Sequence, residues 1–560
     1  MGDATQHCGR GAIIFTTLIG AQALRSFNRS ETLRPPARYA RGSLSAHRVI
    51  KMTTQGEIED GTLDFNREIA IDAIPEGRLL KGVFEGEPLV ALRRGDRIGV
   101  FRGKCTHLGG PLAEGLLVGD TVRCPWHQAC FDLATGEAVA APAFAPLARF
   151  SVHIEDGRVR LAKPQAADAQ RKPRAPAREE SFLIVGGGGA GFAAADMLCR
   201  EGVERGITLV SSDASKPYER TLLTKDYLDG GTGDPRIGLG AEPLDERGVR
   251  IELNAEVARL DRGRHIAALT DGRELRYDRL LLATGAEPRR PDFPGAGRPQ
   301  VHVLRSLADA RAIVAAAKSA RRVVVLGSSF IGLEAGASLR QRGLEVDIVS
   351  QDKAPMARIF GPGIASVIVA LHEKHGVRLH LGRAIASFDG AAVTLDDGAR
   401  LEADLLLIGI GVTPRLQLAK AAGLQVEDGV VVDRFLQTSD GDVFAAGDIA
   451  AWPDPHSGQR LRVEHWSVAV RQGQIAAKNM LGGRTPYADV PFFWSMQFDF
   501  LPSYLGHAKE WDEIRIDGDP GKNDCAARYL LNGRVMATLM IGRDMECLEE
   551  RERMERALAG

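Results

Sequence analysis

The sequence predicts a multidomain protein: a small all-β domain, then two doubly wound α/β folds with parallel sheets, and an α+β domain at the C-terminus. Short alternating strands broken by glycine-containing turns run from about residue 65 to 162. A buried strand, a glycine turn and a helix begin at residue 181, and the stretch that begins at residue 321 repeats this plan. A chain of 560 residues is also too long for a single core.

Charge and cysteine content narrow the class of protein. The 72 basic and 73 acidic residues nearly cancel, so nothing global favours nucleic acid or an anionic membrane as a partner. Seven cysteines in 560 residues form no disulfide framework and are typical of a reducing compartment. We therefore expect a cytoplasmic protein with no nucleic-acid partner.

Two segments carry no fold signal. Residues 1–52 are rich in Arg and Ser and contain the apolar run "GAIIFTTLIGAQAL", which is shorter than the ~20 residues of a transmembrane segment. We interpret them as a disordered extension or as an over-early start before Met52, with a targeting segment as the alternative. Residues 163–180 are rich in Ala, Pro and charge, which predicts a linker.

The first glycine turn has the spacing of a nucleotide-binding motif. Gly186, Gly188 and Gly191 form G-x-G-x-x-G between a strand and a helix. In such a turn the first glycine permits the bend, the second lets a pyrophosphate approach, and the third lets the helix lie close to the strand. Asp213 ends the next strand, where a carboxylate can hold a ribose hydroxyl. We therefore predict nucleotide binding.

Two later stretches indicate which nucleotide. "LLLATGAEPRR" contributes Thr284 and Gly285, and "DVFAAGDIA" contributes Gly447 and Asp448. Together with the glycine turns they resemble the two-dinucleotide-fold flavoprotein reductases, whose Rossmann-like folds bind FAD and NAD(P)H. The resemblance implies that Asp448 bonds the ribityl chain of FAD. It also implies residues 181–301 and 425–490 for the FAD domain, 302–424 for the NAD(P)H domain, and 491–560 for the C-terminal reductase domain.

Shorter stretches resemble the ferredoxin-reductase and apoptosis-inducing-factor-like branch of these proteins. "PYERTLLTKDYL" provides Arg220 and Lys225 as candidate flavin contacts, and "FIGLE" provides Glu334, which in this branch pairs with the lysine beside the flavin. "FFWSMQFD" provides Trp494 as an aromatic wall. The alternative for Lys225 is a solvated surface lysine, and the alternative for Trp494 is a tryptophan of the core. The Cys-x4-Cys pair of disulfide reductases is missing from this region, so we expect electrons to leave the flavin by another route.

The second glycine turn departs from the motif. It consists of Gly327, Ser329 and Gly332, with serine in place of the middle glycine. Ser350 ends the next strand, where NADH-selective relatives usually carry an acidic residue, and no arginine directly follows it. The sequence therefore leaves the co-substrate open between NADH and NADPH, and we favour NADH.

A Cys-x-His pair and a Cys-x-x-His pair precede the linker. They supply four candidate metal ligands: Cys105, His107, Cys124 and His127. Zinc fingers normally have paired cysteines followed by paired histidines, whereas each short pair here has one of each. The two loops resemble those of Rieske domains, which hold a [2Fe–2S] cluster by two cysteines on one iron and two histidines on the other. A structural zinc site is the alternative, and the resemblance covers residues 65–162.

Residues beside the ligands bear on the reduction potential. High-potential Rieske proteins join the two loops by a disulfide and direct a Ser and a Tyr hydroxyl at cluster sulfurs. The matching positions here are Gly110 and Trp126 for the disulfide, and Ala129 and Phe131 for the hydroxyls. Because hydrogen bonds to sulfur raise the potential, we predict a value of about −150 mV, at the low end of the Rieske range. Cys130 is expected to be an unpaired, buried thiol.

The order of the domains resembles the apoptosis-inducing-factor-3-like oxidoreductases. It implies an NAD(P)H-dependent flavoprotein that passes electrons through FAD to its own Rieske cluster and on to an external acceptor. Lys225 and Glu334 are the catalytic candidates. A ferredoxin, a cytochrome or an oxygenase component could be the acceptor. The alternative is a slow redox sensor whose redox state controls conformation or partner binding.

Overall fold

The computed structural model describes residues 57–58, 61–162, 180–240 and 242–558. The extension expected at residues 1–52 and the linker expected at 163–180 lie outside the described residues, apart from Glu180.

Among its described residues, the N-terminal domain contains β-strands and short 3-10 turns and no α-helix. Its largest sheet has the order β1-β2-β4-β5-β6, and a four-stranded sheet has the order β10-β9-β8-β7. The two candidate ligand loops follow β6 (Arg97–Arg102) and connect β8 (Thr121–Arg123) to β9 (Cys130–Asp132). The other strands are β1 (Glu57–Ile58), β2 (Thr62–Asp64), β3 (Ile69–Ala70), β4 (Leu80–Phe84), β5 (Glu87–Arg94), β7 (Leu116–Val118), β10 (Ala138–Ala140), β11 (Ser151–Glu155) and β12 (Arg158–Ala162).

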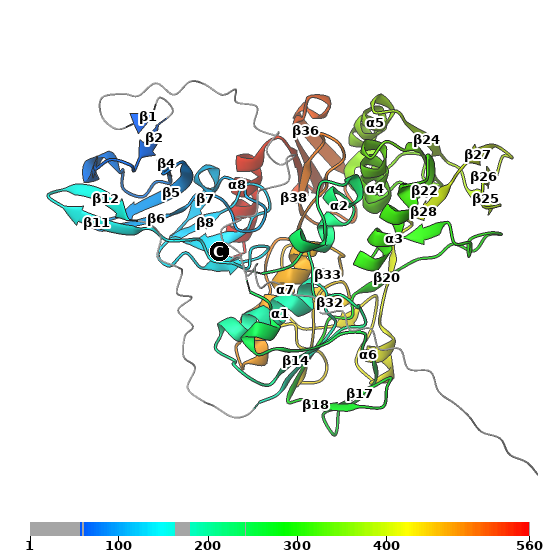
Figure 1. Cartoon of the computed structure of the whole chain (residues 1–560), viewed down its shortest axis with the longest axis horizontal. Helices are drawn as coiled ribbons and strands as arrows, with labels where there is room; N and C mark the ends of the chain where they lie inside the picture. The colour runs from blue at the N-terminus through cyan, green and yellow to red at the C-terminus, as the bar shows by residue number, and fades with distance from the viewer. Residues whose placement is uncertain (1–56, 59–60, 163–179, 241, 559–560) are drawn as a thin grey trace, which may run out of the picture. The chain divides into compact units, whose positions relative to one another are not determined.

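The first α/β fold follows residue 180. Its parallel sheet has the order β15-β14-β13-β19-β31. Figure 1 labels strand β14 of this sheet. The strands are β13 (Phe182–Val185), β14 (Ile207–Val210), β15 (Arg250–Glu252), β19 (Arg279–Leu282) and β31 (Val443–Ala445). Strand β31 pairs with β19 although a second complete sheet lies between them in the sequence. The second α/β fold is therefore an insertion within the first.

The inserted fold repeats the plan with the order β21-β28-β22-β23-β24. Its strands are β21 (Val301–Val303), β22 (Arg322–Leu326), β23 (Glu345–Ser350), β24 (Val377–Leu381) and β28 (Leu405–Ile408). Its helices are α3 (Leu307–Ala317), α4 (Phe330–Gln341) and α5 (Ala357–Lys374). The central strands of both parallel sheets are almost continuously buried, as expected when both faces of a sheet are covered.

The two glycine turns have the same close helix–strand approach. A Cβ atom on Gly191 would lie 1.8 Å from the carbonyl oxygen of Gly186, and one on Gly332 would lie 2.0 Å from that of Gly327. Any side chain at either position would therefore push the helix away from its strand. The helices that follow are α1 (Gly189–Arg200) and α4.

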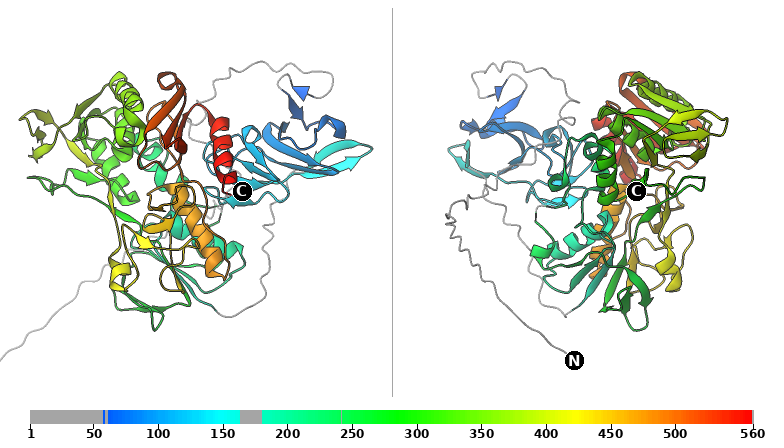
Figure 2. Two further views of the ribbon diagram at one scale, coloured as in Figure 1. Left: turned by 180° about the vertical axis from the view of Figure 1, so that it is seen from behind. Right: turned by 45° about the vertical axis from the view of Figure 1, so that its right-hand side comes forward.

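The C-terminal domain is a five-stranded antiparallel sheet followed by a helix. The sheet order is β34-β35-β38-β37-β36, and α8 (Asp544–Arg556) lies beside it (Figure 2). The strands are β34 (Phe492–Trp494), β35 (Pro502–Gly506), β36 (Glu513–Asp519), β37 (Asp524–Leu531) and β38 (Arg534–Ile541). Helix α8 contacts β35 and β38 of its own domain and β7 of the N-terminal domain.

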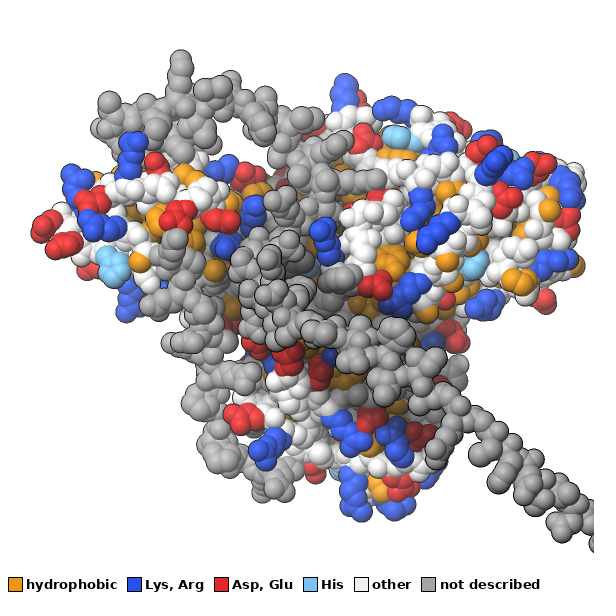
Figure 3. Space-filling model, in the orientation of Figure 1, with side chains coloured by type: hydrophobic (Ala, Val, Ile, Leu, Met, Phe, Trp, Pro, Cys, Tyr) orange, Lys and Arg blue, Asp and Glu red, His pale blue; other side chains and the backbone are white. Residues whose placement is uncertain are grey.

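The described surface carries both signs of charge. Figure 3 shows Lys and Arg side chains interspersed with Asp and Glu on the face that it presents, in keeping with the near-zero net charge. In the part of the chain that the structure describes, no helix combines the length and the apolar character needed to cross a membrane.

Candidate active site

Backbone hydrogen bonds close each candidate ligand loop on itself. The amide of Cys105 donates to the carbonyl of Gly110 over 2.8 Å, and the amide of Cys124 donates to the carbonyl of Ala129 over 2.8 Å. The ligand residues are therefore held in tight turns that follow β6 and β8.

The two loops bring the like residues together. Cys105 and Cys124 are 4% and 1% exposed, and each thiol shifts the pKa of the other. The rings of His107 and His127 lie 4.9 Å apart, centroid to centroid, at 87°. Among the described residues no group of three His, Cys, Asp or Glu side chains is placed to hold a single metal ion. A sulfur pair beside an imidazole pair is the donor set of a Rieske cluster.

Burial, hydrogen bonds and neighbouring charges shift the pKa values of these side chains. Burial raises the pKa of the Cys105 thiol well above its usual value. At Cys124 burial acts in the same direction, but hydrogen bonds from Cys105 and from the amides of Trp126 and His127 outweigh it, so the pKa is lowered. Burial, and then the charges of His107 and Lys225, hold the pKa of His127 well below its usual value. The shifts at Cys124 and His127 favour the thiolate and the neutral imidazole, which are the forms that bind iron, whereas the shift at Cys105 favours the thiol.

The surroundings of the sulfur pair provide no hydroxyl from the positions singled out in the sequence. A Cβ atom on Gly110 would lie only 2.7 Å from Cys124 Sγ, so no side chain fits there without a shift. Ala129 and Phe131 are fully buried and offer no hydroxyl. Cys130 is a buried free thiol, as expected from the sequence.

A cavity of about 1150 Å³ lies in the first α/β fold and reaches the inserted fold and the C-terminal domain. It is lined by many of the residues singled out in the sequence: Gly186, Gly188, Asp213, Arg220, Lys225, Thr284, Gly285, Glu334, Gly447, Asp448 and Trp494. Gly191, Gly327, Ser329 and Gly332 are not among its lining residues. The lining residues come from segments that are widely separated in the sequence, so the cavity depends on the assembled fold.

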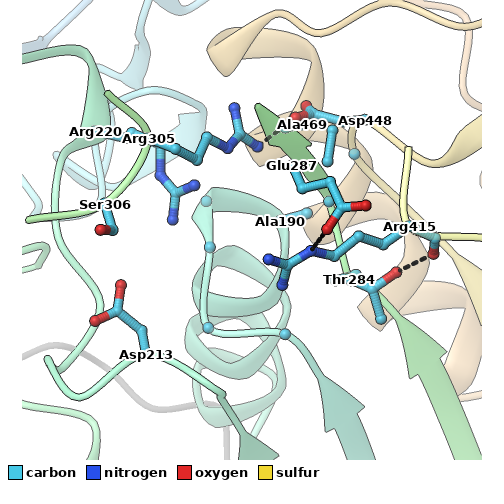
Figure 4. Close-up of a pocket in the computed structure, with 18 of the residues that line it drawn as sticks. Ala190, Asp213, Arg220, Thr284, Glu287, Arg305, Ser306, Arg415, Asp448 and Ala469 are labelled. Carbon is cyan, nitrogen blue, oxygen red and sulfur yellow. Dashed lines mark hydrogen bonds and ion pairs between the residues drawn. The ribbon is translucent and has the colours of Figure 1, made fainter. Parts of the chain in front are cut away.

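Two arginines meet at one part of the cavity. Arg305 donates to Asp448 Oδ2 over 2.6 Å, and Figure 4 shows Arg220 close to Arg305. Burial, and then the charge of Arg305, lower the pKa of Arg220. Two neighbouring guanidinium groups with one carboxylate leave an excess of positive charge, which fits a pyrophosphate.

Another part of the cavity wall carries the carboxylate of Asp213 (Figure 4). Asp213 Oδ2 accepts a hydrogen bond from the Tyr218 hydroxyl over 2.8 Å, which fixes its orientation. Thr284 donates to the carbonyl of Arg415 over 2.9 Å. A Cβ atom on Gly188 would meet nothing within 4 Å, so the backbone there is open to a ligand.

Lys225 and Glu334 form a buried ion pair that lines the cavity. Lys225 Nζ lies 2.6 Å from Glu334 Oε2, and both side chains are 5% exposed. The ammonium also donates to the Thr221 carbonyl and to Thr224 Oγ1, each over 3.2 Å. All three of its protons therefore have acceptors.

A chain of hydrogen bonds continues from this pair into the protein. Ser495 donates to Glu334 Oε1 over 2.7 Å, and the side-chain amide of Gln497 donates to Ser495 Oγ over 3.4 Å. The side-chain oxygen of Gln497 lies 3.0 Å from His372 Nε2. His372 is fully buried, and burial lowers its pKa to about 4, so a neutral ring donates to Gln497. In this series of hydrogen bonds, each donor is directed towards Glu334.

Trp494 connects the cavity with the candidate ligand loops. Its ring centroid is 4.3 Å from that of His127 and 6.1 Å from that of His107, while the same indole lines the cavity. His107 has a second neighbour, because its Nε2 lies 3.6 Å from Glu219 Oε2, and both side chains are 5% exposed.

The end of β23 gives no charge-based preference for one coenzyme. The Ser350 side chain is 4% exposed and bonds Ser328 over 2.8 Å. Arg358, which follows on α5, pairs with Asp352 over 3.0 Å. The choice between NADH and NADPH therefore stays a prediction.

Some of the buried polar atoms without a hydrogen-bond partner lie at the ligand loops and in the cavity, where cofactors would fit. Among the described residues they include both ring nitrogens of His107, the indole nitrogens of Trp466 and Trp494, and Nδ1 of His465. The last three side chains line the cavity. Such atoms are rarely left unpaired. The donor sets therefore fit a [2Fe–2S] cluster at the loops and FAD in the cavity, and define a flavoprotein reductase with an appended iron–sulfur domain.

Comparison with known families agrees with this class. The pyridine nucleotide-disulphide oxidoreductase family matches residues 180–473, and the Rieske [2Fe-2S] domain family matches residues 66–151. The chain belongs to the pyridine nucleotide-disulphide oxidoreductases and carries a Rieske domain on the N-terminal side of the reductase. It is an oxidoreductase that uses FAD, a [2Fe–2S] cluster and NAD(P)H.

Individual relatives match different shares of the chain. Human apoptosis-inducing factor 3 is 30% identical over 461 residues, which are 79% of this chain and 76% of that protein. Rhodocoxin reductase of Rhodococcus erythropolis is 37% identical over 325 residues, 57% of this chain and 76% of that protein. The covalent putidaredoxin reductase–putidaredoxin complex has a chain that is 30% identical, with a TM-score of 0.66 over 68% of this chain and 94% of that chain. The first alignment is longer than the reductase part alone, so it extends into the N-terminal domain.

Several site residues were missed in the sequence. Glu219 lies in the "PYER" stretch, and its neighbour Arg220 drew attention instead. Arg305 had no motif around it. Ser495 and Gln497 closely follow Trp494, and only the fold brings Ser495 to Glu334.

Proposed function

We propose that this ferredoxin-reductase-like protein passes electrons from NAD(P)H through FAD to its own Rieske cluster and on to an external acceptor. The observation that carries the proposal is the position of Trp494, which lines the cavity and lies 4.3 Å from the His127 ring, centroid to centroid. When bound, FAD supplies the conversion of a two-electron hydride donor into single electrons, which suits a cluster that takes one at a time.

The protein's own residues support this by binding and by charge. Arg220 and Arg305 would hold the pyrophosphate, and Asp213 a ribose hydroxyl. Lys225, fixed by Glu334, would place a positive charge where the reduced, anionic flavin needs stabilisation. Trp494 would exclude water from the cavity.

The surroundings of the cluster favour a potential of about −150 mV. Gly110, Trp126, Ala129 and Phe131 provide neither a disulfide nor a hydroxyl near the sulfurs. A reduced flavin can deliver electrons to such a centre. A potentiometric titration that placed the midpoint well above zero would contradict this part of the proposal.

The names of relatives suggest which kind of protein accepts the electrons. A Burkholderia cepacia relative, 34% identical over 378 residues (65% of this chain and 92% of that protein), is the ferredoxin–NAD(+) reductase component of an anthranilate 1,2-dioxygenase system. For this chain we propose a ferredoxin, a cytochrome or an oxygenase component as acceptor, and a cytoplasmic location. NADH is the favoured co-substrate.

Stopped-flow reduction with NADH and with NADPH tests the proposal, with flavin and cluster absorbance followed separately. We expect the cluster to be reduced after the flavin at a rate that supports turnover with a protein acceptor. A flavin that is reduced while the cluster stays oxidised would refute the electron path. Slow reduction with a long-lived charge-transfer band would instead favour the redox-sensor alternative.

A further inference from the structure

Gln128, which directly follows His127, has an unusual backbone. Its φ is +62°, in the left-handed region where glycine is at ease and other residues are strained. The residue is nevertheless a glutamine, and only 3% of it is exposed. A buried, non-glycine residue in this conformation indicates that the side chain serves a purpose.

Both ends of the Gln128 side chain bond to α8. Its side-chain amide donates to Cys547 Sγ over 3.4 Å, and its side-chain oxygen accepts from Arg551 Nη1 over 2.6 Å. Cys547 is 2% exposed. The partners of this Rieske-domain side chain thus belong to the last helix of the reductase, at the far end of the described chain.

The other flank of the same ligand loop is also tied to α8. Arg123, the last residue of β8, donates to Glu555 Oε2 over 2.8 Å. Arg551 donates to Glu555 Oε1 over 2.6 Å, so Glu555 joins the two arginines. Helix α8 therefore contacts the residues immediately before Cys124 and immediately after His127.

This arrangement fixes the histidine that faces the flavin cavity. The loop from Cys124 to His127 can turn relative to Trp494 only if its two flanks leave α8. We propose that Gln128, supported by Arg123, is the anchor by which α8 holds the ligand loop so that His127 contacts Trp494. The anchor rests on the proposed function, because it serves the electron path from flavin to cluster.

The substitution Gln128→Gly separates anchoring from cluster assembly. Glycine relieves the backbone strain, so the loop keeps its turn while both hydrogen bonds to α8 are lost. We expect unchanged iron content, unchanged cluster midpoint potential and an unchanged rate of flavin reduction by NADH. Electron transfer from flavin to cluster should slow by about tenfold, since a hydrogen bond to a charged group no longer holds the loop against α8.

A second readout does not depend on turnover. Hydrogen exchange of the α8 amides in the protein with its cofactors bound should quicken in Gln128→Gly, because the helix loses contacts with the Rieske domain. The matched control is Glu85→Gly, which replaces another residue of positive φ, +50°, at an exposed turn of the same domain. The control should match the wild type in both measurements.

Two outcomes would overturn the anchor. One is wild-type electron transfer and wild-type exchange of α8 in Gln128→Gly. The other is an equal effect in Glu85→Gly. If Gln128→Gly fails to assemble the cluster, Arg551→Met decides instead, because it removes the charged partner on α8 and leaves the Rieske sequence intact. A wild-type protein whose cluster never accepts electrons refutes the proposed function itself, which distinguishes the two failures.

Discussion

The cluster loops and the flavin cavity are built in opposite ways. The four candidate cluster ligands lie within residues 105–127, in two turns closed by their own backbone hydrogen bonds. The cavity is lined by residues from Val185 to Trp494, and its buried ion pair joins Lys225 to Glu334 across 109 residues. One site is a local structure, whereas the other exists only when two α/β folds and the C-terminal sheet are assembled.

Because the two sites are built differently, a substitution that disrupts one of them should leave the other intact. A ligand substitution in a loop should remove the cluster and spare the cavity. A substitution in the buried ion pair should instead act on the stability of the whole reductase. The following predictions test that separation, beginning with the largest effect.

Cys124→Ser should abolish cluster assembly and leave FAD bound. Serine is a poor ligand for iron, and the other three ligands cannot complete the site. Iron and flavin content of the purified protein measure both effects. The control is Cys130→Ser, a nearby buried thiol that is not a candidate ligand and should keep its iron. Loss of FAD in Cys124→Ser would contradict the independence of the two sites.

Lys225→Met should lower the free energy of unfolding by about 3–5 kcal/mol, because it leaves the buried Glu334 carboxylate without its counter-charge. The double variant Lys225→Met/Glu334→Met should regain most of this loss. Chemical denaturation measures the change. Lys216→Met breaks an exposed pair with Asp245 of 2.7 Å and should cost less than about 1 kcal/mol. Equal effects of the two lysine variants would refute the role of burial.

Ser495→Ala should cost about 2 kcal/mol, since Glu334 Oε1 loses the hydroxyl that donates to it. The matched control is Thr538→Val on β38 of the C-terminal sheet, whose strand β34 ends directly before Ser495. Thr538 is also fully buried, but its hydroxyl has no hydrogen-bond partner among the described residues, so its loss should leave stability nearly unchanged. Denaturation curves of the two variants at pH 7 compare their free energies of unfolding directly. An unchanged free energy in Ser495→Ala would contradict a stabilising hydrogen bond from Ser495 to Glu334.

His372→Gln should remove part of the decrease in the free energy of unfolding that occurs as the pH falls. Burial lowers the pKa of His372 to about 4, against about 6.5 in an unfolded chain. Below pH 6.5 the unfolded state therefore takes up a proton that the folded state does not, and stability falls as pH falls. This residue alone accounts for about 1 kcal/mol between pH 6.5 and 5.5. The measurement is the free energy of unfolding of wild type and variant at pH 6.5 and 5.5. The difference between the two proteins at each pH gives the contribution of His372.

An exposed histidine provides the control for this pH effect. His153→Gln changes a side chain in contact with solvent on β11 and should retain the wild-type acid sensitivity. A loss of pH dependence in His153→Gln equal to that in His372→Gln would contradict burial as the cause.

Much of the fold could be predicted from the sequence, for reasons that differ between elements. The strand–turn–helix units at Gly186 and Gly327 each carry their signal within one short stretch, so both parallel sheets were predictable. The all-β domain was predictable from alternating strands. The pairing of β19 with β31 was anticipated only through the family resemblance, because a strand's partner across a long insertion has no local signal.

The site divides in the same way. Cysteine and histidine spacing identified the candidate cluster ligands, since each pair must lie in one tight turn to reach the same metal centre. Glu219, Arg305 and His372 could not be found, because each acts on a residue far away in the chain. The strained backbone of Gln128 was equally invisible, since glutamine itself gives no indication of a positive φ.

By itself, then, the sequence indicated the chemistry: two Cys/His pairs and two glycine turns by their spacing, and Lys225 and Glu334 as candidates by a family resemblance. The Cys/His pairs and the glycine turns depend on spacing along the chain, which folding does not alter. Only the tertiary structure decided how the parts meet. His127 contacts Trp494, Ser495 of the C-terminal domain donates to Glu334, and Arg551 of α8 donates to Gln128. Each of these contacts joins residues from different domains, and only packing brings such residues together.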